Sequence, residues 1–299
     1  MYERLAKRMI PWSFPSPRIM VNPHVGNKAN AFYNEQERLL GFHTFTTADG
    51  KERSTAESAD IVTHETAHAV LDGMRDLWNE SFGLGPRAFH ESFGDLTAML
   101  VALQDDTLIH TLLKLTKGNL RKTSFVTEVA ERLVDELQTT DEARREDTLY
   151  LRNAFNMLYM QPFDDLEYMP AEPDVTLSRQ EHNYSRVFTG AIYDILVGIY
   201  ENMLEQGKPP FVALFRAAEV VGHMLVTAIE LGPVGEFDFA DMAKAMLTAD
   251  AVVRHSRNRD VMMKVFHERK IIDMDASDAH VYRMANLPEI ELPQTLNNA

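Results

Sequence analysis

Hydrophobic residues recur at helical spacing along most of the chain from residue 54 onward. The stretches GLGPR, QGKPP and LGPVGEF interrupt this pattern, because Gly and Pro favour breaks between helices. The first helical stretch opens with Ser54-Thr-Ala-Glu57, which has the form of a capping box. The pattern predicts helices over roughly these residues: 54–78, 86–104, 124–137, 183–206, 210–231, 237–254 and 257–270.

The first 53 residues follow a different pattern. They contain four of the thirteen prolines and several short runs of β-prone residues. In the clearest run, ANAFYNEQERLLGFHTF, an aromatic segment and a second apolar segment flank a polar turn, which predicts a hairpin. We therefore expect an α+β, mostly helical fold in which a small N-terminal β-containing part leads into a larger C-terminal helical bundle.

Three segments show no clear periodicity of hydrophobic residues. Residues 138–148 are a charge run, which is typical of a solvated helix end or loop. Residues 156–178 contain three prolines and an acidic cluster, and we interpret them as a long loop of the kind that often borders a function. The tail from about residue 287 is expected to be irregular.

Charge and composition narrow the function classes. The 299 residues carry a formal net charge of −15, which argues against binding nucleic acid or an anionic membrane, since both require a basic face. The apolar stretch 211–232 is interrupted by charged residues, so we expect a buried helix there rather than a membrane span. No run of signal-peptide length begins the sequence, so localisation stays open: cytoplasmic as written, exported only if this is part of a longer precursor.

The absence of cysteine leaves only His, Asp and Glu as strong metal ligands. His64, Glu65 and His68 form the pattern His-Glu-x-x-His within a predicted helix. Residues four apart share a helix face, so both imidazoles can reach one ion, and Glu65 can act as a base beside it. The same pattern also occurs by chance on polar helix faces, so the motif alone leaves two ordinary histidines as the alternative.

A third ligand elsewhere in the chain would favour a metal site over two ordinary histidines. The extended pattern with a third histidine fails, because Leu71 and Met74 stand where Gly and His are required. Glu91, on the next predicted helix, is the expected third ligand, and Asp95 lies one turn further on the same face to accept a hydrogen bond from a ligand histidine. Two rivals are less favoured. Glu80 would need a sharp chain reversal, and His90 is expected to face elsewhere.

Several short motifs in this order resemble those of the thermolysin-like zinc endopeptidases, which are gluzincins. The matching segments are NAFY, DIVTHETAHAV, HESFGDL, LYLRNAFN and EHNYSRVFTGAIYDIL. The resemblance implies an edge strand at Asn30 and Ala31 that pairs with a peptide substrate. It also implies Arg152 as a contact to the substrate carbonyl and His182 as a second catalytic histidine.

The resemblance further implies a truncated β/α catalytic lobe over residues 1–150, with the zinc helices at its junction, and a helical lobe over 151–299 that carries His182. The chain also departs from the family. Ala102 stands where an acidic calcium ligand is usual, so calcium is not expected, and Phe82 falls near the position of an oxyanion-binding tyrosine.

We therefore expect zinc-dependent hydrolysis of peptide bonds, with zinc on His64, His68 and Glu91 and with Glu65 as the general base. The expected partner is a peptide or protein substrate. Two alternatives remain at this point: an aminopeptidase of the wider gluzincin class, and a catalytically inactive zinc protein that binds peptides.

Overall fold

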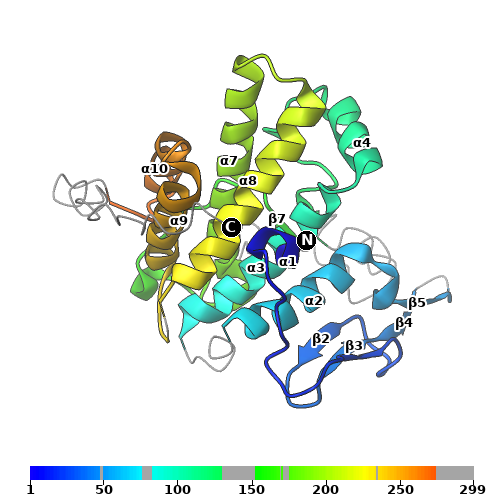
Figure 1. The fold of residues 1–299 in the computed structure, drawn as a ribbon. Helices are drawn as coiled ribbons and strands as arrows, with labels where there is room; N and C mark the ends of the chain where they lie inside the picture. The colour runs from blue at the N-terminus through cyan, green and yellow to red at the C-terminus, as the bar shows by residue number, and fades with distance from the viewer. Residues whose placement is uncertain are drawn as a thin grey trace, which may run out of the picture.

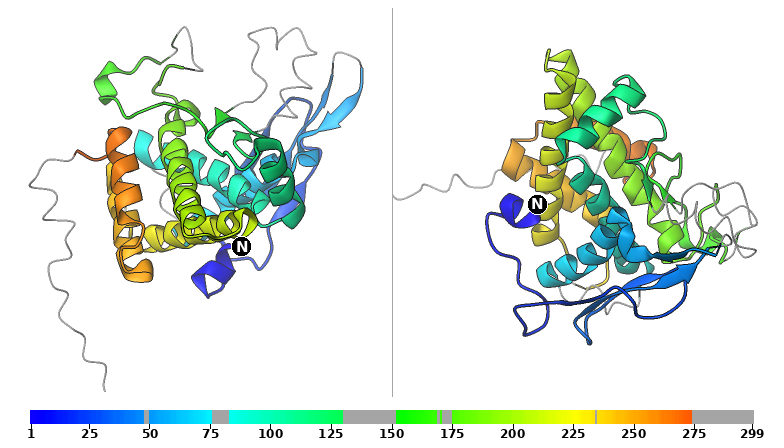
Figure 2. Two further views of the ribbon diagram at one scale, coloured as in Figure 1. Left: turned by 90° about the horizontal axis from the view of Figure 1, so that it is seen from above. Right: turned by 90° about the vertical axis from the view of Figure 1, so that its right-hand side faces the viewer.

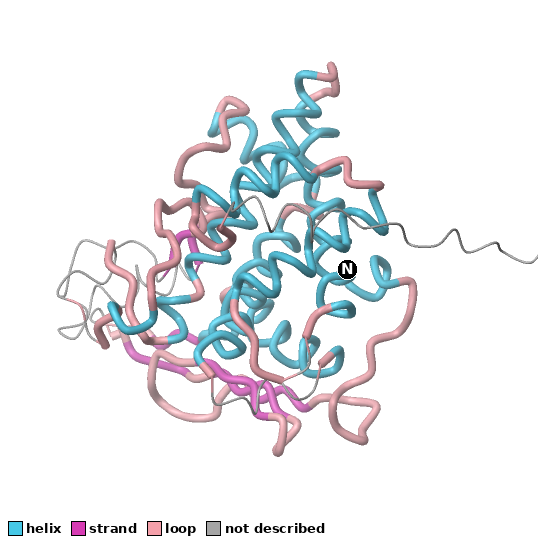
Figure 3. Tube along the Cα trace, turned by 90° about the vertical axis from the view of Figure 1, so that its left-hand side faces the viewer, coloured by secondary structure: helices cyan, strands magenta, loops and turns pink. Residues whose placement is uncertain are grey.

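The computed structural model describes residues 1–47, 50–75, 83–129, 152–168, 170, 175–233 and 235–273. The fold is α+β and mostly helical, as the sequence predicts. The strands of the first 54 residues lie together along one side of the molecule, and the C-terminal helices pack away from them (Figures 1 and 2). Figure 3 shows helices lying directly against the strands at this side of the molecule. Helix α2 (Ala59–Met74) packs against both a strand and a helix there and carries the predicted metal motif.

The N-terminal part contains two small sheets. In the first, β1 (Met20–Asn22), β3 (Leu39–Phe42) and β2 (Ala31–Asn34) are arranged in the order β1-β3-β2. The antiparallel pair β2–β3 is the predicted hairpin, and β2 occupies an edge of the sheet. The second sheet pairs β4 (Thr44–Thr46) with β5 (Glu52–Ser54).

The helix that carries the metal motif begins later than predicted. Ser54 caps a 3-10 turn, η1 (Thr55–Glu57), by accepting a hydrogen bond from the Ala56 N–H. Ser58 is extended, and α2 runs over Ala59–Met74. The capping signal at Ser54 was therefore real, but it starts a separate turn that precedes the α-helix.

The second helix, α3 (Leu84–Ala102), packs along α2 and starts two residues before the predicted position. Its buried residues cover nearly all faces, so it forms the centre of the protein rather than an amphipathic surface helix. This central position fixes the side chains of α3 against those of α2.

The C-terminal helices agree with the predicted ones to within about three residues at each end. A short helix α6 (Glu181–Tyr184) leads directly into the first of them. The four are α7 (Arg186–Glu205), α8 (Pro210–Leu231), α9 (Phe239–Arg254) and α10 (Arg259–Glu268). Among the described residues, only α8 is long and apolar enough to span a membrane by length and composition. Within it, 67% of the apolar 18-residue stretch is buried inside the protein, as in a core helix.

The predicted helix 124–137 was wrong where it is described. Its start is a turn followed by β6 (Glu128–Val129), which pairs with β7 (Arg152–Asn153); the rest lies outside the described residues. The turn has a local cause. Aromatic and β-branched residues, which have low helix propensity, occupy positions 125–127, and Thr127 Oγ1 donates a hydrogen bond to the Ser124 carbonyl.

Two helices in the described part of the chain were not predicted. They are α1 (Tyr2–Ala6) and α4 (Asp106–Thr116). The loop predicted over 156–178 is irregular where it is described, apart from the 3-10 turn η3 (Phe163–Asp165).

Other expectations concern the division of the chain. The charge run 138–148, the tail beyond 287 and the boundary between residues 150 and 151 lie outside the described residues. One hydrophobic cluster includes residues from both sides of that boundary, such as Phe93 of α3 and Phe188 of α7.

Candidate metal centre

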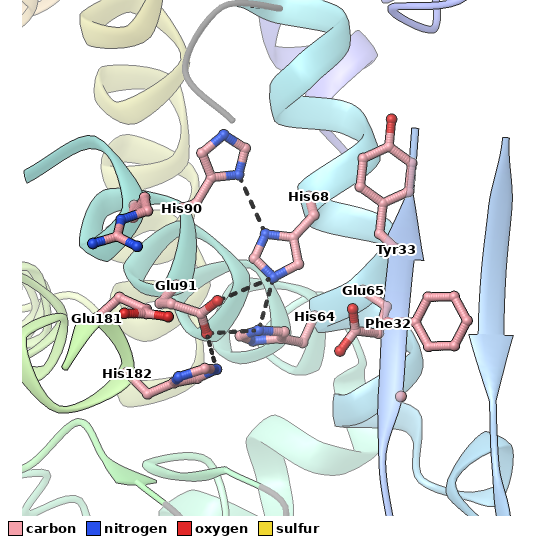
Figure 4. Close-up of a pocket in the computed structure, with 11 residues that line it drawn as sticks. Phe32, Tyr33, His64, Glu65, His68, His90, Glu91, Glu181 and His182 are labelled. Carbon is pink, nitrogen blue, oxygen red and sulfur yellow. Dashed lines mark hydrogen bonds and ion pairs between the residues drawn. The ribbon is translucent and has the colours of Figure 1, made fainter. Parts of the chain in front are cut away.

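Helix α2 presents His64 and His68 one turn apart on one face (Figure 4). Their Nε2 atoms lie 3.1 Å from each other, and the two rings are nearly perpendicular, at 85°. Both rings are largely buried, with side-chain exposures of 8% and 14%. The helical spacing therefore brings two imidazole nitrogens to one point, as the motif predicts.

Helix α3 brings Glu91 to the same point. One carboxylate oxygen lies 3.3 Å from His64 Nε2, and the other lies 3.6 Å from His68 Nε2. Two ligands about 2.0–2.1 Å from a tetrahedral zinc ion are themselves roughly 3.3–3.4 Å apart. The three separations, 3.1, 3.3 and 3.6 Å, are close to that value, so the three residues fit a zinc ion without large rearrangement.

Asp95 holds the far side of the His64 ring, one turn along α3 from Glu91. Its carboxylate lies 3.0 Å from His64 Nδ1. A carboxylate in this place accepts the Nδ1–H, which leaves the Nε2 lone pair directed at the metal position. Gly94 allows this close approach, because a Cβ atom at that position would lie 2.5 Å from the His64 ring.

Burial and close contact shift the pKa values of the ionisable groups at the centre. Burial acts to lower the pKa of His64, but hydrogen bonds to Asp95 and Glu91 outweigh it and raise the pKa to about 10. Burial lowers the pKa of His68 to about 3. Burial would raise the pKa of Glu91, but His64 and His68 hold it well below its ordinary value. Without a metal ion, the Nε2–H of a protonated His64 therefore faces Glu91 and occupies part of the space that suits a cation.

The Glu65 side chain lies between α2 and β2, on the side of His64 opposite to Glu91 (Figure 4). Burial raises the pKa of this carboxyl group, while the nearby His64 acts to lower it. The Tyr33 N–H donates a hydrogen bond to its carboxylate. Glu65 is thus fixed beside the three candidate ligands, in a position suited to a base.

His182, at the start of the C-terminal helices, approaches the centre from α6. Its Nε2 atom lies 3.3 Å from a Glu91 oxygen, and its side chain is 46% exposed. A cavity of about 280 Å³ opens between His182, Glu65 and β2. The structure therefore brings the two predicted catalytic residues to the same cavity as the candidate ligands.

The edge strand requires one correction. Asn30 has its backbone groups engaged within the N-terminal part: its N–H donates to the Lys28 carbonyl, and its carbonyl accepts from His43 and Thr55. Asn30 therefore does not offer these groups to a substrate. Because His43 bonds Asn30, the alternating ladder turns the backbone groups of Ala31 and Tyr33 away from β3.

Arg152 also occupies a different place from the predicted substrate contact. Its guanidinium makes two hydrogen bonds to Asp95, of 2.7 and 2.8 Å, and lies 3.8 Å from Glu91. It lines a neighbouring cavity of about 380 Å³ rather than the cavity at the metal position. Arg152 thus supports Asp95, which in turn holds His64.

The expectation that His90 faces elsewhere was wrong. His90 Nδ1 lies 3.3 Å from His68 Nδ1, on the side of that ring away from the ligand atoms. Asp72 is the next residue in this direction, 3.4 Å from His90 Nε2. A sequence signal for Asp72 existed, since it follows His68 by four residues and so shares its helix face. The rival ligand Glu80 and Phe82 lie outside the described residues.

The fold and the site together define a mostly helical α+β protein with a candidate two-histidine, one-glutamate metal centre at a helix–strand junction. The sequence matched no protein-family model, and a search of curated proteins found no match. The chemistry of the chain's own residues is therefore the basis for a function.

Proposed function

We propose that this protein is a zinc-dependent peptidase in which His64, His68 and Glu91 hold the metal and Glu65 is the general base. The observation that carries the proposal is the position of Glu65. It lies beside three converging ligand atoms, in the same open cavity, without being one of them. A purely structural zinc site is closed by four protein ligands and has no use for such a base.

Zinc, when bound, supplies a Lewis acid that polarises the scissile carbonyl and lowers the pKa of water to about 7. The protein then handles the proton. Glu65 accepts it from the attacking water and delivers it to the leaving amine. Burial supports this role, because it raises the pKa of Glu65 toward the range in which a carboxylate both accepts and releases a proton.

His182 is the proposed donor to the oxyanion that develops on the substrate carbonyl. It reaches the cavity from the side opposite Glu65. Its side chain is 46% exposed, so it has room to turn its Nε2–H from the Glu91 oxygen, 3.3 Å away, to a substrate. Arg152 has no direct part in this proposal, because its two hydrogen bonds to Asp95 commit it to positioning His64.

The substrate is proposed to bind as an added strand along the edge of β2. Ala31 and Tyr33 both line the cavity, and their backbone groups face away from β3. The Tyr33 N–H already bonds Glu65, so Ala31 would supply both its N–H and its carbonyl, and Tyr33 its carbonyl. An extended peptide can bond to such an edge through its own main chain. This arrangement would place a peptide bond between β2 and the candidate ligands, within reach of Glu65.

The test is digestion of a peptide library by the zinc-loaded protein, by the same protein after chelation, and by the Glu65→Gln variant. The proposal predicts cleavage only in the first sample, with restoration when zinc is returned to the chelated protein. Binding of peptides without cleavage would support an inactive zinc protein instead. Libraries with blocked and free N-termini separate the remaining alternative, since an aminopeptidase requires a free amine.

A further inference from the structure

A chain of polar side chains leads away from the three candidate ligands, starting at Nδ1 of His68, the ring nitrogen that does not face Glu91. It runs from His68 through His90 to Asp72 and then to Tyr33 of the edge strand. The side chains of His90 and Asp72 are 6% and 0% exposed, so solvent cannot serve as their partner. None of these contacts is required to form the three-ligand group itself, so the chain needs its own explanation.

The contact between the two histidine rings has the geometry of a hydrogen bond. Their Nδ1 atoms are 3.3 Å apart, while the ring centres are 5.5 Å apart and the planes differ by only 26°. The rings therefore meet edge to edge, with the two nitrogen atoms close to the line between the ring centres. A contact of this kind needs one ring to donate a proton and the other to accept it.

The direction of the bond follows from the ligand role of His68. A neutral imidazole that binds a metal through Nε2 carries its proton on Nδ1, so His68 must be the donor. His90 must then accept through Nδ1, which places its own proton on Nε2, facing the Asp72 carboxylate at 3.4 Å. This distance exceeds the usual hydrogen-bond range, and contacts of this kind often tighten when a site binds its ligand. The Tyr33 hydroxyl also bonds to Asp72.

We propose that His90 is a positioning residue for the metal ligand His68: it accepts the His68 Nδ1–H, and Asp72 fixes the tautomer of His90 that makes this possible. The inference rests on the proposed zinc site, but not on the proposed hydrolysis. Asp95 and His90 then have matching roles, since each holds the far nitrogen of one ligand histidine.

Two substitutions of His90 with similar shape test the acceptor role. In Asn, the side-chain oxygen is bonded to Cγ, as Nδ1 is in His, so His90→Asn keeps an acceptor near the same place. His90→Leu has a methyl group there and keeps none. Loss of such a partner typically weakens metal affinity by about 10–100-fold. We expect that loss for His90→Leu and a much smaller one for His90→Asn, measured by zinc titration against a chromophoric chelator.

The matched controls are His110→Leu and His110→Asn. His110 lies on α4, where its ring bonds the Asp106 carbonyl, and both variants should bind zinc as the original protein does. Equal zinc affinity for His90→Leu and the original protein would overturn the proposal. Equal weakening in His90→Leu and His90→Asn would also overturn it, because the loss would then not depend on an acceptor. If the original protein binds no zinc, the proposed function fails first, before any variant is compared.

A measurement on the unmutated protein covers the case in which His90→Leu does not fold. Long-range nitrogen–proton NMR spectra of the zinc-loaded protein report the tautomer of each ring, with the His90 signals assigned through His90→Asn. The proposal predicts a proton on His90 Nε2 and none on Nδ1. A proton on Nδ1 would contradict it, since that nitrogen could not then accept from His68.

Discussion

Replacing Glu65 with Gln removes the proposed base and changes little else. The side chain keeps its length, and its carbonyl oxygen can still accept the Tyr33 N–H. The candidate ligands His64, His68 and Glu91 are untouched, and Glu65 is not in the group of converging ligand atoms. The substitution therefore separates proton transfer from zinc binding.

The size of the effect follows from the role. General base catalysis contributes about 10²–10⁴-fold. That corresponds to roughly 3–6 kcal/mol of activation free energy, at about 1.4 kcal/mol for each factor of ten. The free energy of unfolding of Glu65→Gln, in contrast, should rise or stay unchanged. Burial raises the folded-state pKa of Glu65, so the folded protein binds this proton more tightly than the unfolded chain. The ionised carboxylate thus costs stability as pH rises past its ordinary titration range, and Gln removes that cost.

The assay measures kcat/KM on a cleaved peptide, together with bound zinc and thermal unfolding, for Glu65→Gln and the original protein. We expect a loss of at least about 100-fold in kcat/KM, one zinc ion per chain in both proteins, and an equal or higher Tm for the variant. Glu205→Gln, a substitution of an exposed acid at the end of α7, is the matched control and should leave all three unchanged. Retained turnover in Glu65→Gln would refute its role as base, whereas loss of zinc would show that Glu65 is a ligand.

Three further predictions concern the neighbouring groups. His182→Phe should lower kcat by about 10²–10³-fold with little change in KM, because it removes a donor to the developing oxyanion; steady-state kinetics with an unchanged kcat would exclude this role. Asp95→Asn should weaken zinc binding by about 10–100-fold in a chelator titration. It should also lower the free energy of unfolding by about 3–5 kcal/mol, because the buried Arg152 guanidinium loses the carboxylate that accepts both of its hydrogen bonds; denaturant unfolding with no change would contradict the ion pair's role. In the zinc-free protein, NMR should show the His64 ring protonated up to about pH 10. Its raised pKa stabilises the fold fully below about 6.5, the unfolded value, and this contribution is lost as pH rises through 10; an ordinary midpoint near 6.5 would be inconsistent with the His64–Glu91–Asp95 geometry.

Long periodic segments and the hairpin were predictable from the sequence because their cause is local. The helices α7 to α10 and the pair β2–β3 follow from hydrophobic spacing and turn residues within a few positions. Helix α4 was missed, although Asp105 caps its first turn and Ile109 and Leu112 share its buried face. The hydrophobic spacing and the cap were present but covered only a short segment, and helices were predicted only in the longer periodic segments on either side of it.

The candidate site was predictable where one helix sets the geometry. His64 and His68 converge because four residues make about one helical turn, and Glu91 and Asp95 share a face of α3 for the same reason. The partners that come from elsewhere were not predictable in this way. Whether Arg152 reaches a substrate or Asp95, and whether His90 faces solvent or His68, depends on how α2, α3 and β7 pack together. Local spacing carries no information about that packing.

The most direct test of the central claim is the zinc X-ray absorption spectrum of the protein loaded with one equivalent of zinc. The account predicts four light ligands at about 2.0–2.1 Å, with multiple-scattering features of two imidazoles and the remainder oxygen. The Glu91→Gln variant should bind zinc more weakly than the original protein. A spectrum with three or more imidazoles, which would require His90 or His182 as a ligand, would contradict the assignment, as would a protein that takes up no zinc.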